Sequence, residues 1–397
     1  MATLLNLPGV RIQEVRLGAP PIAGVGTSTA GFVGMAPDKT RFPNLLRQVT
    51  SADQFFADYI RDPTAPDDET KGAQQNTNLG MAVLGFFQNG GTECFVVNVG
   101  SEAPGDIKKG IDLLATREEI DIIAAPGIID AGTYNALIDQ AASTTNRFAI
   151  LDPPAPVANL TDLQKGGALR PKDSIWAGFY YPRIQVSPVL KKDKDDLTAD
   201  PTKKFFAPPS GHVAGLYART DGERGVHKAP ANVPLFGALA VEHLITDAQQ
   251  DVLNNDSVNI IRAFSEGPTV FGARTLLVND APDKTFRYIS VRRLTTFIEQ
   301  SLRIGLRFAV FEPNNLALRQ TITRSVRGFL DGVWRDGALF GATADEAYYV
   351  RFPDSFNTDT DRALGKLTVE IGIRVAPPAE FIIIRIGLLD RPANATA

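Results

Sequence analysis

The chain has 397 residues, of which 44% are hydrophobic and 22% are charged, a composition that is typical of a folded protein and excludes a disordered one. Its 41 Lys and Arg residues nearly balance 45 Asp and Glu residues, so no overall charge favours binding to nucleic acid or to an anionic membrane. The single cysteine, Cys94, excludes an intramolecular disulfide, and the apolar run around it predicts a buried side chain. The length predicts two or three domains.

Two features bear on where the protein is made. No apolar stretch reaches the ~20 residues that a helix needs to cross a bilayer, so no direct membrane insertion is expected. The first residues lack a basic region followed by a long apolar core, so no secretory signal is predicted. We expect synthesis in a reducing cytoplasm. If the protein works outside the cell, we expect release by lysis or as part of a particle.

The first hundred residues predict an extended start followed by alternating strands and helices. Pro8-Gly9 and Pro20-Pro21 bracket a partly alternating segment, and they prevent a helix there. The next predicted elements are a strand over 27–34, a helix after Thr50 with Ser51 as its cap, a loop over 61–78, a helix over 78–88 and a strand over 94–99.

The middle of the chain continues this alternation. Ile107, Ile111 and Leu114 have helical spacing. The further predicted elements are a strand over 120–125, a helix over 134–142, a strand over 147–151, and a solvated excursion or hairpin from about 190 to 205. Strands that alternate with helices predict a parallel sheet covered by helices, so the predicted fold class is mixed α/β.

The C-terminal third has the clearest periodicity. The predicted elements are a helix with Leu294, Phe297, Ile298 and Leu302 on one face, a strand over 308–311 ended by Pro313, a long helix with Ile322, Val326, Phe329 and Val333 inward, and a strand over 367–375. The outer face of the long helix carries Arg324, Arg327, Asp331 and Arg335.

The segment 379–387 predicts an apolar strand near the end of the chain. An exposed apolar strand favours aggregation unless something covers it. Two alternatives follow from the residues alone: the strand pairs within its own subunit, or a partner subunit covers it by strand addition.

The sequence contains no recognisable catalytic or cofactor site. The three histidines, His212, His227 and His243, lack a metal-ligand spacing. Ser210, His212 and Asp221 suggest a catalytic triad, but no Gly-x-Ser-x-Gly elbow is present, and helix capping explains Ser210 better. No nucleotide-binding fingerprint is complete. We therefore expect no cofactor, no metal and no enzymatic activity.

Two groups of charged residues remain to be explained. The segment 287–293 holds three arginines, but its pattern predicts a strand leading into a helix, with the arginines on a solvated or interface face, so no nucleic-acid binding is expected. Glu299, Glu312 and Glu380 are isolated carboxylates near arginines, and we predict structural ion pairs for them.

Several short motifs, taken together, point to one family. The most informative is residues 207–232, APPSGHVAGLYARTDGERGVHKAPAN. The others are residues 8–15 (PGVRIQEV), 21–34, 84–91 (LGFFQNGG), 94–99, 287–294 (RYISVRRL), 311–314 (FEPN), 337–341 (GALFG), 346–350 and 378–381 (PAEF). In content and order the set resembles the contractile tail sheath proteins of myophages and phage-like injection systems. The compact middle is similar to the shorter sheaths of phage-like injection particles and simple tails, more than to large myophage sheaths with extra outer domains.

The resemblance implies a structural protein rather than an enzyme. It implies hexameric rings that stack helically around an inner tube, and a contraction that drives the tube through a target envelope without ATP. The implied partners are further copies of the chain, an inner tube protein, and baseplate and terminal cap proteins, in a particle made in a bacterial cytoplasm. The implied domains are an N-terminal arm over 1–20, a core sheath domain over 21–95 and 285–397 that includes a C-terminal arm, and an inserted outer α/β domain over 96–284.

The resemblance also assigns roles to particular residues. In the family, both terminal arms add strands to the sheets of neighbouring subunits. The arm residues implied here are Val10, Ile12, Glu14, Val15, Phe381, Ile382, Ile383, Ile384 and Ile386. Arg324, Arg327 and Arg335 are predicted to contact the tube, and an ordinary solvated helix face is the alternative.

Two other functions stay open at this point. One is an α/β enzyme with an unrecognised active site. The other is a different tail or baseplate component. A tube protein is disfavoured, because tube proteins are usually smaller single-domain barrels and the middle of this chain has a βαβ pattern.

Overall fold

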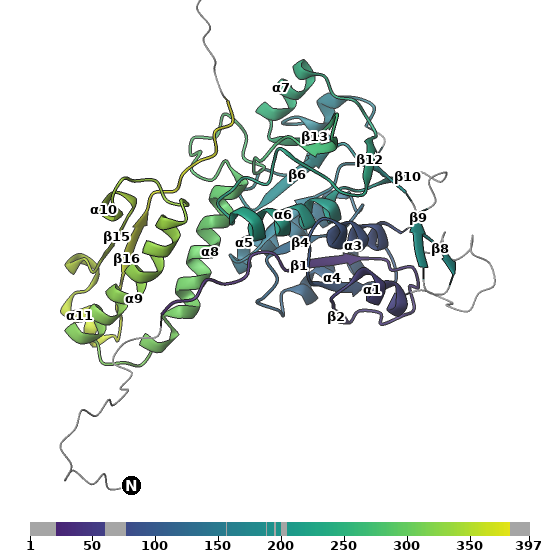
Figure 1. Ribbon diagram of the computed structural model, residues 1–397. Coiled ribbons are helices and arrows are strands. Elements are labelled where there is room, and N and C mark those ends of the chain that lie inside the picture. Colours follow the sequence, from purple (N-terminus) through teal and green to yellow (C-terminus); the bar gives the residue numbers. More distant parts are fainter. Residues whose placement is uncertain are drawn as a thin grey trace, which may run out of the picture. The chain divides into compact units, whose positions relative to one another are not determined.

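The computed structural model describes residues 21–59, 77–155, 157–187 and 205–381, together with the backbone of 189–193 and 196–199 (Figure 1). The chain divides into two compact units. The first, called here the α/β unit, comprises Gly26–Phe297 and Ala376–Ala397, and the second comprises Met1–Val25 and Ile298–Val375. The boundary at residues 297 and 298 falls inside one helix, α8 (Ile289–Gly305).

The α/β unit is built on a nine-stranded sheet with the order β11-β14-β13-β6-β5-β4-β1-β3-β2. Its strands are β1 (Ala30–Gly34), β2 (Leu46–Val49), β3 (Cys94–Asn98), β4 (Ile122–Ala124), β5 (Phe148–Leu151), β6 (Ala177–Tyr181), β11 (Val233–Pro234), β13 (Val258–Phe264) and β14 (Gly267–Val270). The six strands from β13 to β3 run parallel, and β2, β14 and β11 add antiparallel edges. The predicted mixed α/β class is confirmed.

Helices cover both faces of this sheet (Figure 1). They are α1 (Ala52–Tyr59), α3 (Asn78–Gln88), α4 (Pro104–Leu114), α5 (Ala131–Thr144), α6 (Ser210–Arg224) and α7 (Asp247–Asn255), with the short 3-10 turn η1 (Leu160–Leu163). Successive β1 residues point to opposite faces: Phe32 packs with the core of α3 and α6, and Val33 with that of α4 and α5. Cys94 is buried in the first of these cores, as predicted.

Helices α3 and α6 pack unusually closely because glycines line their contact. A Cβ atom at Gly211 would lie 2.2 Å from the carbonyl oxygen of Ala82, and one at Gly215 would lie 2.3 Å from that of Phe86. On the other helix, a Cβ atom at Gly85 would lie 2.2 Å from the ring of His212. The glycines of the 207–232 motif therefore set how near these two helices come to each other.

Two smaller sheets complete the α/β unit. Strands β10 (Phe205–Ala207), β7 (Ile184–Val186) and β12 (Ala238–Val241) form one of them in that order. Strands β8 (Val189–Asp193) and β9 (Asp196–Ala199) form an antiparallel hairpin, the second of the two forms predicted for the region from about 190 to 205.

The second unit centres on α9 (Leu316–Arg335). Its further elements are η2 (Arg307–Ala309), α10 (Ala344–Ala347), β15 (Tyr348–Arg351), η3 (Asp354–Phe356), α11 (Asp359–Ala363) and β16 (Glu370–Ile373). Strands β15 and β16 pair antiparallel. The inward face of α9 is confirmed at Ile322, Val326 and Val333, and Leu330 is buried with them.

Two predictions for this unit are corrected. The strand predicted over 308–311 is wrong: the chain makes the 3-10 turn η2 and then a turn in which Phe311 has a φ of +69°. A short apolar run does not distinguish a strand from other buried or exposed segments. The strand predicted over 367–375 is shorter, because β16 spans only Glu370–Ile373.

The compact units also divide the chain differently from the predicted domains. The predicted boundary at residues 95 and 96 falls inside β3. Strand β1 pairs with β3 on one side and with β4 on the other, so residues before and after this boundary share one sheet.

Candidate functional site at the C-terminal segment

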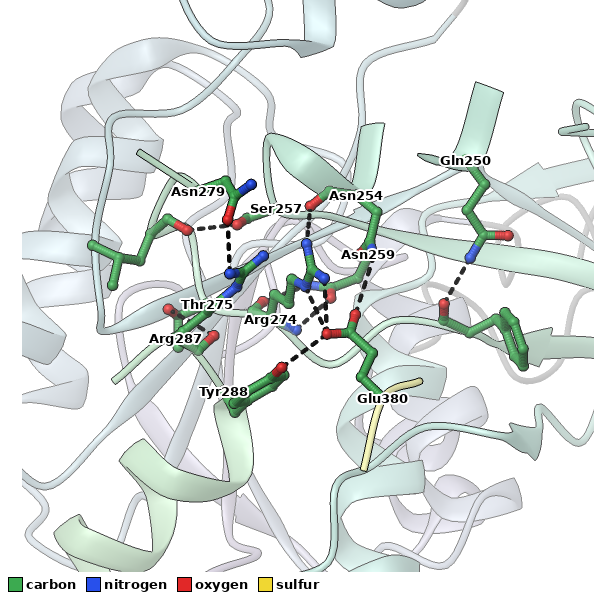
Figure 2. A network of polar contacts seen from close by, with 12 residues as sticks. Gln250, Asn254, Ser257, Asn259, Arg274, Thr275, Asn279, Arg287, Tyr288 and Glu380 are labelled. Carbon is green, nitrogen blue, oxygen red and sulfur yellow. Dashed lines mark hydrogen bonds and ion pairs between the residues drawn. The ribbon is translucent and has the colours of Figure 1, made fainter. Parts of the chain in front are cut away.

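The C-terminal segment is fixed to the α/β unit by the carboxylate of Glu380 (Figure 2). This carboxylate accepts hydrogen bonds from Arg274 Nε at 3.2 Å and Nη2 at 2.8 Å, from Tyr288 Oη at 2.9 Å, and from Asn254 Nδ2 at 3.1 Å. The side chain of Arg274 is only 2% exposed. Both Arg274 nitrogens donate to the same oxygen, Oε2, and hydrogen bonds between ionised groups are among the stronger ones in proteins.

Arg274 is held in place by groups other than Glu380. Its Nη1 donates to the backbone oxygen of Asn254 at 2.5 Å. The side chain of Asn259, on β13, binds both the backbone N–H and the backbone oxygen of Arg274, at 2.7 and 2.8 Å. The guanidinium is therefore preorganised to receive the Glu380 carboxylate.

Burial and the neighbouring hydrogen-bond donors act in opposite directions on the pKa of Glu380. Burial disfavours the ionised carboxyl, but hydrogen bonds from Arg274 and Asn254 outweigh this effect, and the net result is a lowered pKa of Glu380. The ionised form is therefore the one that the surrounding groups stabilise. The ion pair predicted for Glu380 is confirmed.

A wider set of polar contacts stabilises the segment that carries Arg274 and Tyr288 (Figure 2). These are Ser257 Oγ to the Leu277 oxygen (2.6 Å), Thr275 Oγ1 to the Phe286 oxygen (2.8 Å), Arg287 Nη1 to Asn279 Oδ1 (2.8 Å) and Gln250 Nε2 to the Phe271 oxygen (3.0 Å). No sequence pattern indicated these contacts, because their partners lie 8 to 21 residues apart and belong to common polar residue types.

A cavity of about 560 Å³ lies beside this anchor. Its lining is mostly apolar and includes Ala229, Ala231, Phe271, Ala273, Ala376, Pro377 and Pro378, with Tyr288 and Glu380 at one side. Arg224, His227 and Lys228 also line it and give it a basic character. Burial lowers the pKa of Lys228, and the neighbouring Arg224 adds to this effect.

The 207–232 motif contributes a second buried charge. Asp221, on α6, forms a two-pronged ion pair with Arg293, on α8, in which both side chains are at most 6% exposed. Thr27 donates from Oγ1 to Asp221 at 2.6 Å and accepts from Arg293 through its backbone oxygen at 2.8 Å.

This geometry corrects the prediction for the arginines of 287–293. Arg292 and Arg293 are 4% and 5% exposed, and α8 begins at Ile289, so these two side chains are not on a solvated face. Arg292 lies over the rings of Trp176 and Phe286, with its guanidinium carbon 4.4 and 4.2 Å from the ring centroids. The alternation of apolar and basic residues in 287–293 did not predict that Arg292 and Arg293 are buried. Aromatic partners elsewhere in the chain make it possible to bury a guanidinium.

Ser210 is not the N-cap of α6, so that prediction is also wrong. It is the first residue of the helix, and its backbone N–H and Oγ donate to the buried carboxylate of Asp152 at 2.7 and 2.6 Å. His212 is buried against Gly85, and its Nδ1 has no hydrogen-bond partner among the described residues. Ser210 therefore lacks the hydrogen bond to a histidine base that a catalytic triad requires.

The structure describes only some of the residues with predicted roles. Phe381 is described and is 72% exposed, whereas Val10, Ile12, Glu14, Val15, Ile382, Ile383, Ile384 and Ile386 lie outside the described residues. Arg324, Arg327 and Arg335 are exposed on α9, and Arg327 lies 3.7 Å from Asp345.

Two glycines accompany these arginines on the exposed face of α9. Gly328 and Gly332 are one helical turn apart, and a Cβ atom at either position would have no neighbour within 4 Å among the residues that the structure describes. Glycine inside a helix is less favourable than alanine by ~1 kcal/mol, and packing against the described residues does not require it here.

Neither a metal-binding cluster nor a membrane-spanning helix occurs among the described residues. They contain no group of three or more His, Cys, Asp or Glu side chains that could hold a metal ion. None of the described helices combines the length and the apolar character needed to cross a bilayer.

Comparisons with known families identify the chain. The family model "Phage tail sheath protein central domain" matches residues 104–276, and "Phage tail sheath C-terminal domain" matches residues 281–388. The chain belongs to the phage tail sheath protein family. The recognition of this family from the short motifs is thereby confirmed.

Solved structures of sheath proteins are similar over nearly the whole chain. The helical sheath of the anti-feeding prophage in its contracted state is 29% identical, with a TM-score of 0.74, and the match covers 97% of this chain and 99% of that one. The contracted sheath of the PVC extracellular contractile injection system is 26% identical, with a TM-score of 0.75, covering 97% and 98%. A chain in the six-fold symmetrised baseplate of the anti-feeding prophage is 29% identical, with a TM-score of 0.75.

Two curated sheath proteins are similar over shorter lengths. A prophage major tail sheath protein of Pseudomonas aeruginosa is 26% identical over 279 residues, which are 68% of this chain. The tail sheath protein of Burkholderia phage BcepMu is 30% identical over 180 residues, which are 44% of this chain. The chain spans 65% and 36% of the lengths of these two relatives.

Proposed function

We propose that the chain is the sheath subunit of a contractile tail or injection machine. Its copies stack as hexameric rings around an inner tube, and contraction drives the tube through a target envelope. The observation that carries this proposal is the near full-length similarity to a helical sheath in its contracted state. The similarity to a chain from a six-fold symmetrised baseplate supports the hexameric rings.

The Glu380 anchor gives the proposed C-terminal arm a fixed origin. Phe381, the first arm residue, directly follows Glu380, whose carboxylate binds the buried guanidinium of Arg274. Tension on an arm bound to a neighbouring subunit would therefore reach the nine-stranded sheet through Arg274. Backbone hydrogen bonds in the added strands would keep subunits connected while they rotate. In the N-terminal arm, an added strand that includes Val10, Ile12, Glu14 and Val15 would likewise keep subunits connected.

The exposed face of α9 is the proposed contact with the inner tube. Arg324, Arg327 and Arg335 would form exposed charge contacts that are individually weak and can break and re-form during contraction. Gly328 and Gly332 support a close approach, because they leave this face without side chains although packing against the described part of the chain does not require it.

The remaining parts of the proposal concern partners and domains. Baseplate and terminal cap proteins would bind the ends of the sheath. The protein would be made in the bacterial cytoplasm and released by lysis within its particle. The core domain over 21–95 and 285–397 and the inserted domain over 96–284 stay a prediction for the assembled subunit. Catalysis is not part of the proposal, and the bonding of Ser210 to Asp152 gives no support for it.

Electron microscopy tests the proposal directly. We expect the chain expressed alone, or together with its inner tube protein, to form long striated hollow tubes in negative stain. The triple variant Arg324→Glu, Arg327→Glu, Arg335→Glu should lose assembly around the tube. The variant Arg362→Glu, at an exposed arginine in α11, is the control for a charge reversal outside α9. Normal assembly of the triple variant would reject the tube contact, and absence of tubes from both expressions of the unmodified chain would reject the sheath function.

A further inference from the structure

The loop between α8 and α9 presents an apolar tip that the described part of its own chain does not cover. Phe311 is fully exposed, and Val310 and Leu316 are 62% and 70% exposed. Phe311 also has a φ of +69°, in the left-handed region that a bulky side chain rarely occupies. Strained backbone of this kind is concentrated at functional sites.

Hydrogen bonds hold the end of the loop that leads into α9. Asn315 caps α9 by accepting the Leu318 N–H at 2.9 Å, and Asn314 Nδ2 donates to the Lys366 oxygen at 3.2 Å. The backbone N–H of Asn315 donates to the Pro313 oxygen at 2.8 Å. A preorganised tip loses little conformational entropy when it binds a partner.

Charge also distinguishes this tip. Glu312 is exposed beside Phe311, and its carboxylate forms no ion pair with any described residue, so the ion pair predicted for Glu312 is absent from this part of the chain. The tip therefore combines an aromatic ring with an uncompensated negative charge.

The cavity beside Glu380 has the complementary character. Its volume of about 560 Å³ is lined by alanine, proline and the ring of Phe271, which suits an aromatic side chain. Arg224 lines it, is exposed, and forms no ion pair among the described residues, and Lys228 lies close to it in the sequence and also lines the cavity.

We propose that the Phe311 tip of one subunit inserts into this cavity of a second copy, with Glu312 facing Arg224 and Lys228. This inference rests on the proposed self-assembly. A knob and a socket at different places on the same chain make a head-to-tail contact, which is the kind that builds open helical assemblies rather than closed dimers. The contact would also link the second unit of one subunit to the anchored C-terminal segment of the next.

Cysteine cross-linking tests the contact. The natural Cys94 is buried and does not interfere. Assembled chains that carry both Glu312→Cys and Arg224→Cys should form, on mild oxidation, a ladder of disulfide-linked oligomers in a non-reducing gel. A mixture of the two single variants should give only dimers. Assembly without any cross-link would overturn this inference and leave the sheath function intact. A cross-link from residue 224 to the inner tube protein would assign the cavity to that partner instead.

Substitutions at Phe311, Glu312 and Arg224 test the energetics of the contact. Phe311→Gly suits the positive φ, so it should not lower the melting temperature, yet it should weaken assembly roughly thirty-fold, as for the loss of an aromatic hot spot. Glu312→Lys and Arg224→Glu should each weaken assembly, and their combination should restore it. Asp354→Lys, the same charge change elsewhere in the second unit, is the control. Unchanged assembly of Phe311→Gly, or no rescue by the double charge swap, would overturn the inference. If the unmodified chain does not assemble even with its tube protein, the sheath function and this inference both fail.

Discussion

Arg293 and Asp221 form a two-pronged ion pair inside the α/β unit, with Nη1–Oδ1 and Nη2–Oδ2 distances of 2.9 and 2.5 Å. Each residue belongs to a different family motif, 287–294 and 207–232, and Thr27 joins them from a third motif, 21–34. Three motifs that are far apart in the sequence therefore meet at one buried charge pair. Arg293 also lies over the ring of Tyr217, whose hydroxyl bonds that of Tyr180 at 2.5 Å.

Removing one partner of this pair should be strongly destabilising. In Asp221→Asn the buried Arg293 keeps its charge without a counter-ion, so the free energy of unfolding should fall by ~3–5 kcal/mol. Urea unfolding can be followed by fluorescence of Trp176, which lies in the α/β unit, in a Trp334→Phe background.

The double variant Asp221→Leu, Arg293→Met is the matched control for this effect. It removes both charges and should recover most of the lost stability, because no uncompensated charge is left in the core. A loss below ~1 kcal/mol in Asp221→Asn would contradict the assigned role of the pair.

The contact between α3 and α6 predicts opposite effects for two glycines of one helix. In Gly215→Ala the new Cβ would lie 2.3 Å from the Phe86 carbonyl oxygen, so the helices must move apart, at a cost of ~1–3 kcal/mol or more. In Gly222→Ala the Cβ meets nothing within 4 Å, and better helix propensity should raise stability by up to ~1 kcal/mol. Thermal unfolding of both variants measures the difference, and equal effects would argue against the close helix contact.

Local signals explain which elements could be predicted. Helix α3 has the predicted bounds because Thr77 caps its start and Gly90, at a φ of +104°, follows its end. Helix α1 likewise begins after Ser51, whose Oγ accepts the Gln54 N–H at 3.1 Å. These signals lie within a few residues of the element that they define.

The candidate site depended on contacts that no local pattern encodes. The charge of Glu380 suggested an ion pair, but its partner Arg274 is 106 residues away, and β13 and α7 place Asn259 and Asn254 around it. Ser210 shows the same limit. Its residue type favours helix capping, whereas the buried Asp152, 58 residues earlier, determines what its hydroxyl binds.

Asp152 should make the stability of the α/β unit depend on pH. Burial raises the pKa of this carboxyl to about 6, against the hydrogen bonds from Ser210 and Gly127 that favour its ionised form. Because the folded pKa lies above the unfolded value of ~3.9, this group should lower the free energy of unfolding as the pH rises from ~4 to ~6, by ~3 kcal/mol in all.

The variant Asp152→Asn tests this pH dependence. It cannot ionise, so its stability relative to the unmodified chain should increase over the same interval. Urea unfolding at several pH values measures this difference, with Asp139→Asn as an exposed control. A difference that does not change with pH would contradict the raised pKa.

Loss of the Glu380 charge should release the C-terminal segment without unfolding the sheet. In Glu380→Gln the buried Arg274 loses its counter-ion, and only one of the two oxygens that accept from Tyr288 (Oε2) and Asn254 (Oε1) remains. Hydrogen exchange of peptides covering residues 376–381 should therefore become faster, whereas peptides covering β13 should change little. Glu370→Gln, which removes an exposed pairing with Arg351, is the control and should leave residues 376–381 unaffected.

Acid should reproduce this release in the unmodified chain. Because the folded pKa of Glu380 is lowered, its contribution to stability is present above the unfolded value of ~4.3 and is lost as the pH falls through the folded pKa. Exchange at 376–381 should thus accelerate only in that acidic range, and in Glu380→Gln it should be fast already at neutral pH. If the segment stays protected in the variant, the proline-rich wall of the cavity rather than the ion pair holds it, and the arm has no charged anchor.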